Sequence, residues 1–274
     1  QGATLFVDLE RRETRRKYLP AEVLTHFLGG RGANMWLLYN LLQEEKDALD
    51  PEIPLIFGSG VLTSVMPSAT RGNFTSKSPE SYAILDANGG DYFPSFLKRH
   101  GYDHLVLYGK AAQWTLLRIA LGEVTFEDAT PYAGLDNLDT AAAVERDFNC
   151  KERKDMALAR ITSAGENGVL CAGIMGGIKA IWARGGGGAK MGAHNLKAIM
   201  VHGRPPEIAL PADAKAQNKA IGKKITGTSV IKNALKMVGT PFLYKPSRVL
   251  GAMGTKNNQE TSWGESLDAD NFDV

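Results

Sequence analysis

ARGGGGAKMG, residues 183–192, is the stretch that most constrains what this chain builds. Four glycines follow Arg184, and glycine tolerates positive φ and has no Cβ, so peptide N–H groups can approach a ligand closely. Successive N–H groups form an electropositive nest, to which flanking cations add charge. The run therefore predicts a cradle for a phosphate or another compact anion. A flexible linker is the alternative, but linkers are seldom followed by a strand-like segment such as residues 196–201.

A second stretch suited to anions is SATRGNFTSKSP, residues 68–79. Arg71 stands beside a glycine, and Lys77 follows six positions later, on the same face if the segment is a strand of period two. Guanidinium and backbone groups there suit a phosphate or a pterin-like polar ring. The alternative is an exposed strand with ordinary surface cations.

A third stretch, LDANGGDYF at residues 85–93, places Asn88, Gly89 and Gly90 between a predicted strand and a predicted helix. Such a backbone can turn sharply and expose its C=O and N–H groups. A bare Asx-Gly-Gly turn is the alternative. Three loops of this kind in one domain favour a shared ligand site over three unrelated turns.

Composition restricts the class of protein. The 274 residues are 43% hydrophobic and 23% charged, as in ordinary globular chains. A net charge of +2 does not indicate a nucleic-acid-binding surface. The two cysteines form no CxxC pair, which predicts a reduced, cytoplasmic chain. No apolar run is long enough for a membrane span, and the first residues lack a signal-peptide core.

Periodicity predicts an α+β fold. Helices are expected at 20–27, 34–42, 93–99 and 140–148, with glycines breaking the chain at 29–32 and a turn at 163–168. Strands are expected at 4–9, 55–57, 61–65, 74–76, 82–85, 105–108, 116–120, 157–161 and 196–201. After Pro205-Pro206 the chain becomes Lys/Ala-rich and helical over 212–238. We therefore expect a mainly-β base domain with inserted helices at 1–207 and the beginning of a helical domain at 208–274.

Familiar catalytic motifs are missing. There is no P-loop, no HExxH pair and no GxSxG elbow. His100 and His104 are four apart, but Gly101 argues against a helix that would put both on one face. The basic residues between 11 and 17 are interrupted by Glu13 and fit a solvated face. No complete catalytic constellation is found.

The ordered set of glycine-rich segments resembles the N-terminal domain of the aldehyde:ferredoxin oxidoreductase family, tungsten enzymes with a bis-pterin cofactor. The resemblance covers nearly all of residues 1–207, and the residues after 207 look similar to the start of the family's helical second domain. It is carried by LGGRG (28–32), GVLT (60–63), Arg71 with Asn73, KSP (77–79), ANGG (87–90), YF (92–93), GYD (101–103), GK (109–110), AGEN (164–167), ARGGGGA (183–189), MG (191–192) and NLKAI (195–199).

The resemblance implies a base domain on which two pterin dithiolenes lie, with tungsten held by their sulfurs and by no protein side chain. The cofactor-binding positions it implies are Arg71, Asn88, Gly89, Gly90, Ile181, Ala183, Arg184, Gly185 and Gly186. The carbonyls of Asn88 and Ile181 match those around a Mg²⁺ that bridges the pterin phosphates. The chain departs from the family at 180–182, where Ala-Ile-Trp follows Lys179, so a phosphate contact is expected to shift to Lys179 or be lost.

The implied function is oxidation of an aldehyde to a carboxylic acid. Electrons would leave through a [4Fe-4S] cluster to ferredoxin or a partner subunit. The cluster ligands and the catalytic acid and histidine are expected outside this chain, in further domains or a partner chain, and an oligomer is expected. One alternative is the active-site subunit of an aromatic acyl-CoA reductase. Others are a non-catalytic pterin-binding or scaffold homologue and a plain nucleotide-phosphate binder.

Overall fold

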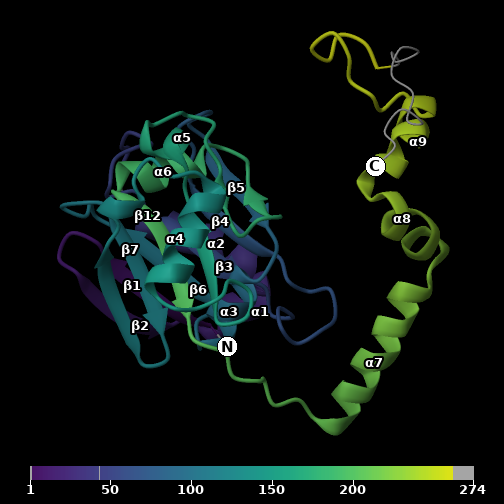
Figure 1. Ribbon diagram of the computed structural model, residues 1–274, viewed down its shortest axis with the longest axis horizontal. Helices are drawn as coiled ribbons and strands as arrows, with labels where there is room; N and C mark the ends of the chain where they lie inside the picture. Colours follow the sequence, from purple (N-terminus) through teal and green to yellow (C-terminus); the bar gives the residue numbers. More distant parts are fainter. Residues whose placement is uncertain (1, 43, 262–274) are drawn as a thin grey trace. The chain divides into compact units, whose positions relative to one another are not determined.

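The chain divides into two compact units, Gln1–Ala209 and Leu210–Val274, and each is described by itself. A computed structural model describes residues 2–42 and 44–261 (Figure 1). The first unit combines two β-sheets with helices, which confirms the predicted α+β class. Among the described residues, no helix is long and apolar enough to cross a membrane.

Each sheet of the first unit has six strands and is mostly antiparallel. The exceptions are the parallel pairs β1–β6 and β7–β12. The first sheet has the order β2 (Glu13–Tyr18), β1 (Ala3–Asp8), β6 (His104–Tyr108), β3 (Leu55–Ser59), β4 (Gly72–Lys77) and β5 (Ile84–Gly89). The second has the order β11 (Ile181–Trp182), β10 (Ile174–Met175), β9 (Met156–Arg160), β12 (Leu196–His202), β7 (Thr115–Ala120) and β8 (Glu123–Asp128).

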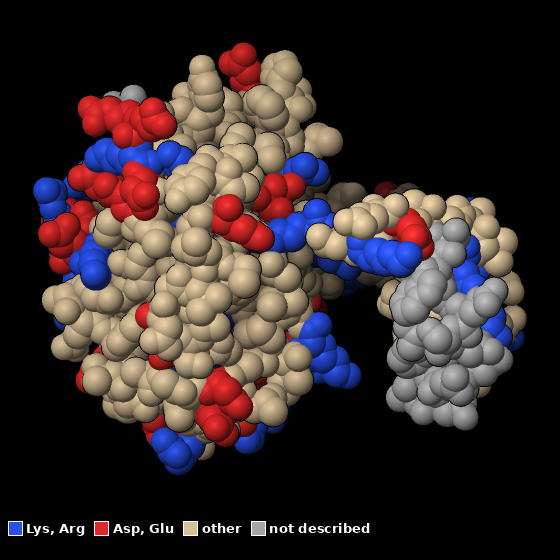
Figure 2. Space-filling model, turned by 90° about the horizontal axis from the view of Figure 1, so that it is seen from above, with Lys and Arg blue, Asp and Glu red and all other residues tan. Residues whose placement is uncertain are grey.

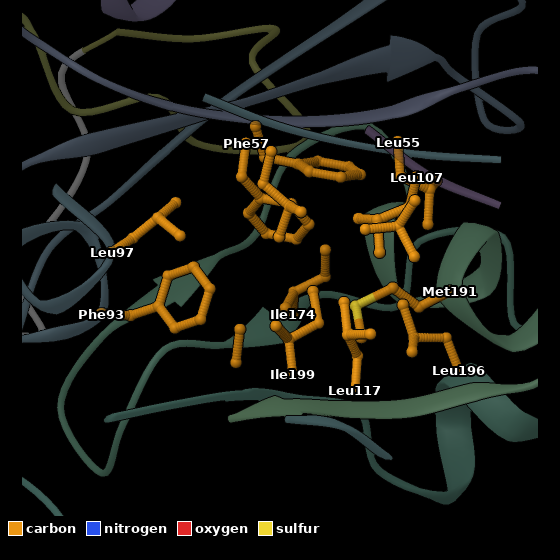
Figure 3. Close-up of a cluster of buried hydrophobic side chains, with 14 of the residues drawn as sticks. Leu55, Phe57, Phe93, Leu97, Leu107, Leu117, Ile174, Met191, Leu196 and Ile199 are labelled. Carbon is orange, nitrogen blue, oxygen red and sulfur yellow. The ribbon is translucent and has the colours of Figure 1, made fainter. Parts of the chain in front are cut away.

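The main core lies between the two sheets. Strand alternation turns Leu5 and Val7 of β1 into this core, whereas Phe6 packs on the other face of the sheet. Figure 3 shows side chains of both sheets pointing toward one another, with Leu55 and Leu107 from one sheet and Leu117 and Ile199 from the other. Burial of this apolar surface is the main stabilising contribution to the unit.

Helices cover the outer faces of both sheets. Leu37 and Leu38 of α2 (Gly30–Leu41) pack with Ile56 and Val106 outside the first sheet. Val144 of α4 packs outside the second sheet. The other helices of this unit are α1 (Ala21–Phe27), α3 (Phe93–Arg99), η1 (Thr130–Tyr132), α4 (Asn137–Asp147), α5 (Ser163–Glu166) and α6 (Gly187–Ala193).

Several local predictions were wrong. Residues 61–65 form turns instead of a strand, and β5 begins at Ile84 instead of residue 82. α1 ends before the glycines at 29–32, as predicted, but α2 begins at Gly30 instead of residue 34. The turn expected at 163–168 begins with the short helix α5. Strands β2 and β8 and helix α6 were not predicted.

The second unit contains a run of helices, as the sequence predicts for residues 212–238. Its elements are α7 (Ala212–Gly227), the π-helix η2 (Ile231–Leu235), α8 (Lys236–Val238), η3 (Thr240–Leu243) and α9 (Tyr244–Val249). None of these elements contains a buried residue. This part of the chain therefore has no core of its own among the described residues.

Candidate functional site

The three glycine-rich stretches meet where β4 begins and β5 ends. Gly72 pairs with Gly89, and Asn73 pairs with Asn88, across these two antiparallel strands. The indole N–H of Trp182 donates to the Gly72 carbonyl oxygen over 3.3 Å. Residues that are more than 90 positions apart in sequence are thus brought to one corner of the first unit.

Trp182 anchors this corner. Its side chain is only 1% exposed, and its ring meets Phe57 and Phe93 edge-on at centroid distances of 5.6 and 5.8 Å. Glycine is required opposite the ring, because a Cβ on Gly89 or Gly176 would lie 2.5 Å from indole atoms. Trp182 is one of the residues at 180–182 where the chain departs from the family. Its side chain therefore packs β11 against β5.

Two cations stand free at this corner. Arg71 and Arg184 are exposed, and within residues 2–42 and 44–261 neither makes an ion pair or a hydrogen bond. Lys179, the candidate for the shifted phosphate contact, is also exposed. An arginine without a protein partner retains all five N–H donors for an anionic ligand.

The glycine run divides into two parts. Gly185 and Gly186 have φ values of 69° and 79°, which glycine adopts without strain, and they form the turn after Arg184. Gly187 and Gly188 are buried at the start of α6, where the Gly188 N–H donates to Ala172 O over 2.7 Å. The interpretation of the whole run as an anion cradle was therefore too wide, because its second half packs within the fold.

The loop that follows β5 has one open position and one fixed position. Asn88 is exposed, and a Cβ on Gly90 would meet nothing within 4 Å. Asp91, at a φ of 62°, is held by the Arg153 guanidinium at 2.8 Å. Ile181 and Ala183 are exposed on either side of the buried Trp182. The loop thus exposes backbone at Asn88 and Gly90, and the ion pair of Asp91 with Arg153 fixes the position of the loop.

The lysines near these stretches do not join the site. Lys77 donates to Lys46 O over 2.5 Å, and six residues of strand place it ~20 Å from Arg71. Lys190 is fully buried, donates to Ala48 O, and burial lowers its pKa to about 7. Lys77 and Arg71 are therefore too far apart to contact one phosphate together.

A buried polar network behind Asn88 was missed by sequence analysis. Asn73 connects Asn88 to Asn34 of α2, and His104 Nδ1 hydrogen-bonds Asn34 Oδ1 at 2.8 Å. All but Asn88 are buried. Single polar residues within strands carry no periodic signal, so only the fold reveals that they meet.

His104 makes the first unit sensitive to acid. Burial lowers its pKa from 6.5 to about 4. As the pH falls, the unfolded chain therefore takes up a proton on His104 before the folded chain does. The stability that the neutral His104 contributes above pH 6.5 is lost as the pH falls toward 4. We expect the free energy of unfolding to drop about 2 to 3 kcal/mol more between pH 7 and pH 4.5 in the native chain than in His104→Gln. Urea unfolding at both pH values measures this; equal drops would contradict it.

Charges on the surface do not gather into a field of one sign. Figure 2 shows Lys and Arg side chains beside Asp and Glu side chains on the face that it draws. Within the described residues no group of three or more His, Cys, Asp or Glu side chains is placed to hold a metal ion. The two cysteines, Cys150 and Cys171, are free.

Comparison with known proteins identifies the family of this chain. The family described as "Aldehyde ferredoxin oxidoreductase, N-terminal domain" matches residues 4–203. The chain belongs to this family. Family membership covers the two-sheet unit and includes every residue of the candidate site.

Curated relatives in the family are longer proteins. A tungsten-containing aldehyde ferredoxin oxidoreductase of Pyrococcus furiosus is 35% identical over 74% of this chain and 33% of its own length. One of Pyrococcus abyssi is 31% identical over 94% of this chain and 42% of its own length. The WOR-like subunit of an aliphatic sulfonate oxidoreductase of Pyrococcus furiosus is 33% identical over 75% of this chain. The chain thus spans about a third to two fifths of the length of relatives such as the first two.

A solved structure shares the fold. The active site complex BamBC of benzoyl coenzyme A reductase, in complex with 1,5-dienoyl-CoA, has a chain that superposes with a TM-score of 0.77 at 27% identity. The match covers 87% of this chain and 36% of the other.

Proposed function

We propose that Gln1–Ala209 is the tungsten bis-pterin base domain of an oxidoreductase that converts aldehydes to carboxylic acids. On this proposal the remaining helical segment begins the second domain. Electrons pass to a [4Fe-4S] cluster whose ligands lie outside this chain, and from there to ferredoxin or a partner subunit. The chain by itself is then catalytically incomplete. The names of the relatives, which are described as tungsten-containing, support tungsten as the metal of this cofactor.

The observation that carries the proposal is the pair of free arginines at the Trp182 corner. Arg71 directly precedes β4 of the first sheet, where Gly72 pairs with Gly89, and Arg184 follows β11 of the second sheet and precedes Gly185; both arginines are exposed. Phosphate groups bind most strongly where guanidinium and backbone N–H donors converge. Open space at Gly90 leaves its backbone accessible to such a group, and Gly185 is half-buried, whereas Gly186 is buried and shapes the turn after Arg184.

The residues present fit the implied cofactor. Arg71 and Arg184 would contact its pterin phosphates, with Gly89, Gly90, Ala183, Gly185 and Gly186 forming the backbone around them. The backbone carbonyl oxygens of Asn88 and Ile181 would hold a Mg²⁺ that accompanies the cofactor. When bound, the cofactor supplies a metal centre that exchanges electrons and oxygen with the substrate. This chain binds, neutralises and orients the cofactor.

Arg184→Ala tests the proposal in the complete protein. We expect tungsten retention to fall at least about tenfold, because a charge-assisted phosphate contact contributes roughly 1.5 to 3 kcal/mol. Arg15→Ala is the control, since Arg15 is an exposed arginine on β2, at the edge of the first sheet opposite β5 and away from the candidate site. Unchanged tungsten content in Arg184→Ala would count against the assignment.

A second candidate function is reduction of an aromatic acyl-CoA. The fold shared with the BamBC complex supports it, and that complex and the WOR-like subunit also support a partner subunit. Turnover of aldehydes against acyl-CoA thioesters by the complete protein separates the two reactions. A non-catalytic homologue would bind pterin and turn over neither.

A further inference from the structure

Asn73 lies at the centre of the buried network behind the candidate site. Its Nδ2 donates to Asp86 Oδ1 at 2.6 Å, and to Ala87 O and Asn88 Oδ1 at 3.3 Å each. Its Oδ1 accepts from Thr75 Oγ1 at 2.5 Å and from Asn34 Nδ2 at 3.0 Å. Both ends of the Asn73 carboxamide are therefore in use.

Two fixed groups set the direction of these hydrogen bonds. Asp86 can only accept while it is ionised, and the Arg31 guanidinium contacts its other oxygen at 2.8 Å. This requires the nitrogen of Asn73 to face Asp86 and, with it, Asn88.

On the opposite side, Asn34 Nδ2 also donates to the carbonyl oxygens of Ile56 at 3.3 Å and Asn73 at 3.1 Å. Asn34 cannot be turned over without pointing its oxygen at both carbonyls, so the orientation of the network is determined from both ends.

The network fixes the Asn88 side chain in turn. A nitrogen of Asn73 faces it, so the atom of Asn88 on that side must be its oxygen. The Asn88 side chain is exposed, and its Nδ2 makes no hydrogen bond with any described residue. The free donor of Asn88 is thus its amide nitrogen.

We propose that Asn88 presents its amide nitrogen to the cofactor and donates a hydrogen bond to an acceptor atom of it, such as a phosphate oxygen, with Asn73 as the positioning residue. This inference rests on the proposed function and deepens it. It assigns different roles to the backbone and the side chain of Asn88. The backbone carbonyl of Asn88 remains available to a cation, whereas the side-chain oxygen is occupied and does not bind one.

Two substitutions at the exposed Asn88 separate these roles in the complete, cofactor-loaded protein. Asn88→Ala removes the donor, and we expect tungsten and pterin to be lost on dialysis about ten times faster. Asn88→Asp keeps the inward oxygen but turns an acceptor with negative charge toward the cofactor. We expect it to lose tungsten and pterin faster than Asn88→Ala. Both variants should unfold at the native temperature.

The opposite ranking overturns the inference. If the side-chain oxygen faced a Mg²⁺, Asn88→Asp would retain magnesium at least as well as the native protein. If neither variant changed the loss of tungsten and pterin, the side chain would not touch the cofactor. The native protein, loaded under the same conditions, is the control. If the proposed function fails, the native protein itself holds no tungsten, molybdenum or pterin, and this outcome differs from all of those above.

The positioning role of Asn73 has its own test. The double variant Asn73→Asp/Asp86→Asn exchanges donor and acceptor without changing net charge, and it forces Asn88 to turn its nitrogen inward. We expect faster loss of tungsten and a lower unfolding temperature, because the buried carboxylate at position 73 would face Ala87 O and Arg31 would lose its charge partner. A purely structural role predicts no faster loss of tungsten than in a β4 variant of equally lowered unfolding temperature. If the double variant does not fold, the two Asn88 variants decide the inference alone.

Ser76→Ala is the matched control for the Asn73 variant. Ser76 is a buried polar residue on the same strand, and it donates to Pro54 O over 2.8 Å. It has no contact with the Asn88 network, so its retention of tungsten should be native. Faster loss in this variant would mean that any damage to β4 has the same effect, which would overturn the positioning role.

Discussion

Trp182→Ala is expected to lower the free energy of unfolding of the first unit by about 3 to 5 kcal/mol. The indole is almost fully buried between Phe57, Phe93 and the glycines of two strands. Its removal would leave a cavity that these glycines cannot fill, and it would abolish the hydrogen bond to Gly72 O. Because β11 would lose its contact with β5, Arg184 would no longer be held near Asn88. Urea unfolding measures the first effect, and tungsten retention in the complete protein measures the second.

Tyr39→Ala is the control for this substitution. Tyr39 is 84% exposed on α2, so removing its ring creates no cavity. We expect its free energy of unfolding to change by less than about 0.5 kcal/mol. A loss for Trp182→Ala no greater than that for Tyr39→Ala would contradict the anchoring role of the indole.

Gly186→Ala is expected to lower the free energy of unfolding by about 2 to 5 kcal/mol for two separate reasons. The φ of 79° is a conformation that an alanine adopts only with strain of roughly 1 to 2 kcal/mol. A Cβ at this position would also lie 1.9 Å from Leu170 O, so the backbone must move, at a further cost of about 1 to 3 kcal/mol. Thermal or urea unfolding of the first unit would show the loss.

Gly90→Ala is the contrasting variant in the same site. A Cβ at Gly90 meets nothing within 4 Å, and its φ lies outside the left-handed region. We expect native stability but weaker cofactor retention, because the new methyl group occupies space left for the ligand. If Gly186→Ala were as stable as Gly90→Ala, the close packing of the glycine run would be refuted.

Much of the first unit could be predicted because its strands are buried on at least one face. Apolar residues mark β1, β3, β6 and β12 in the sequence, and the structure places all four in the core. Strand β2 was missed for the opposite reason. All six of its residues are exposed at the edge of a sheet, so Arg15 and Arg16 give no alternation of apolar and polar positions.

Apolar composition alone also misled at residues 61–65, where Val61 and Leu62 form turns between Gly60 and Pro67. Residues 61–65 form no strand because they follow the end of β3 and have no neighbouring strand to pair with among the described residues.

The candidate site could be predicted in part. Glycine and arginine in one segment point to a ligand, so Arg71, Asn88 and Arg184 could be proposed from sequence alone, and they stay proposals. The network of Asn73, Asn34 and His104 could not be foreseen, because three separate elements bring these residues together. Trp182 was interpreted only as a departure from the family pattern, and its packing role could not be foreseen because Gly72 and Gly89, which lie against its ring, are distant in sequence.

The central claim is that this corner holds a tungsten bis-pterin cofactor, and elemental analysis tests it most directly. The complete protein, purified under anaerobic conditions, would be analysed for tungsten, molybdenum, magnesium, iron and pterin. We expect tungsten with pterin and magnesium, together with the iron of a cluster bound elsewhere. A folded, complete protein that contains neither tungsten nor molybdenum would contradict the claim and would favour a binding or scaffold role.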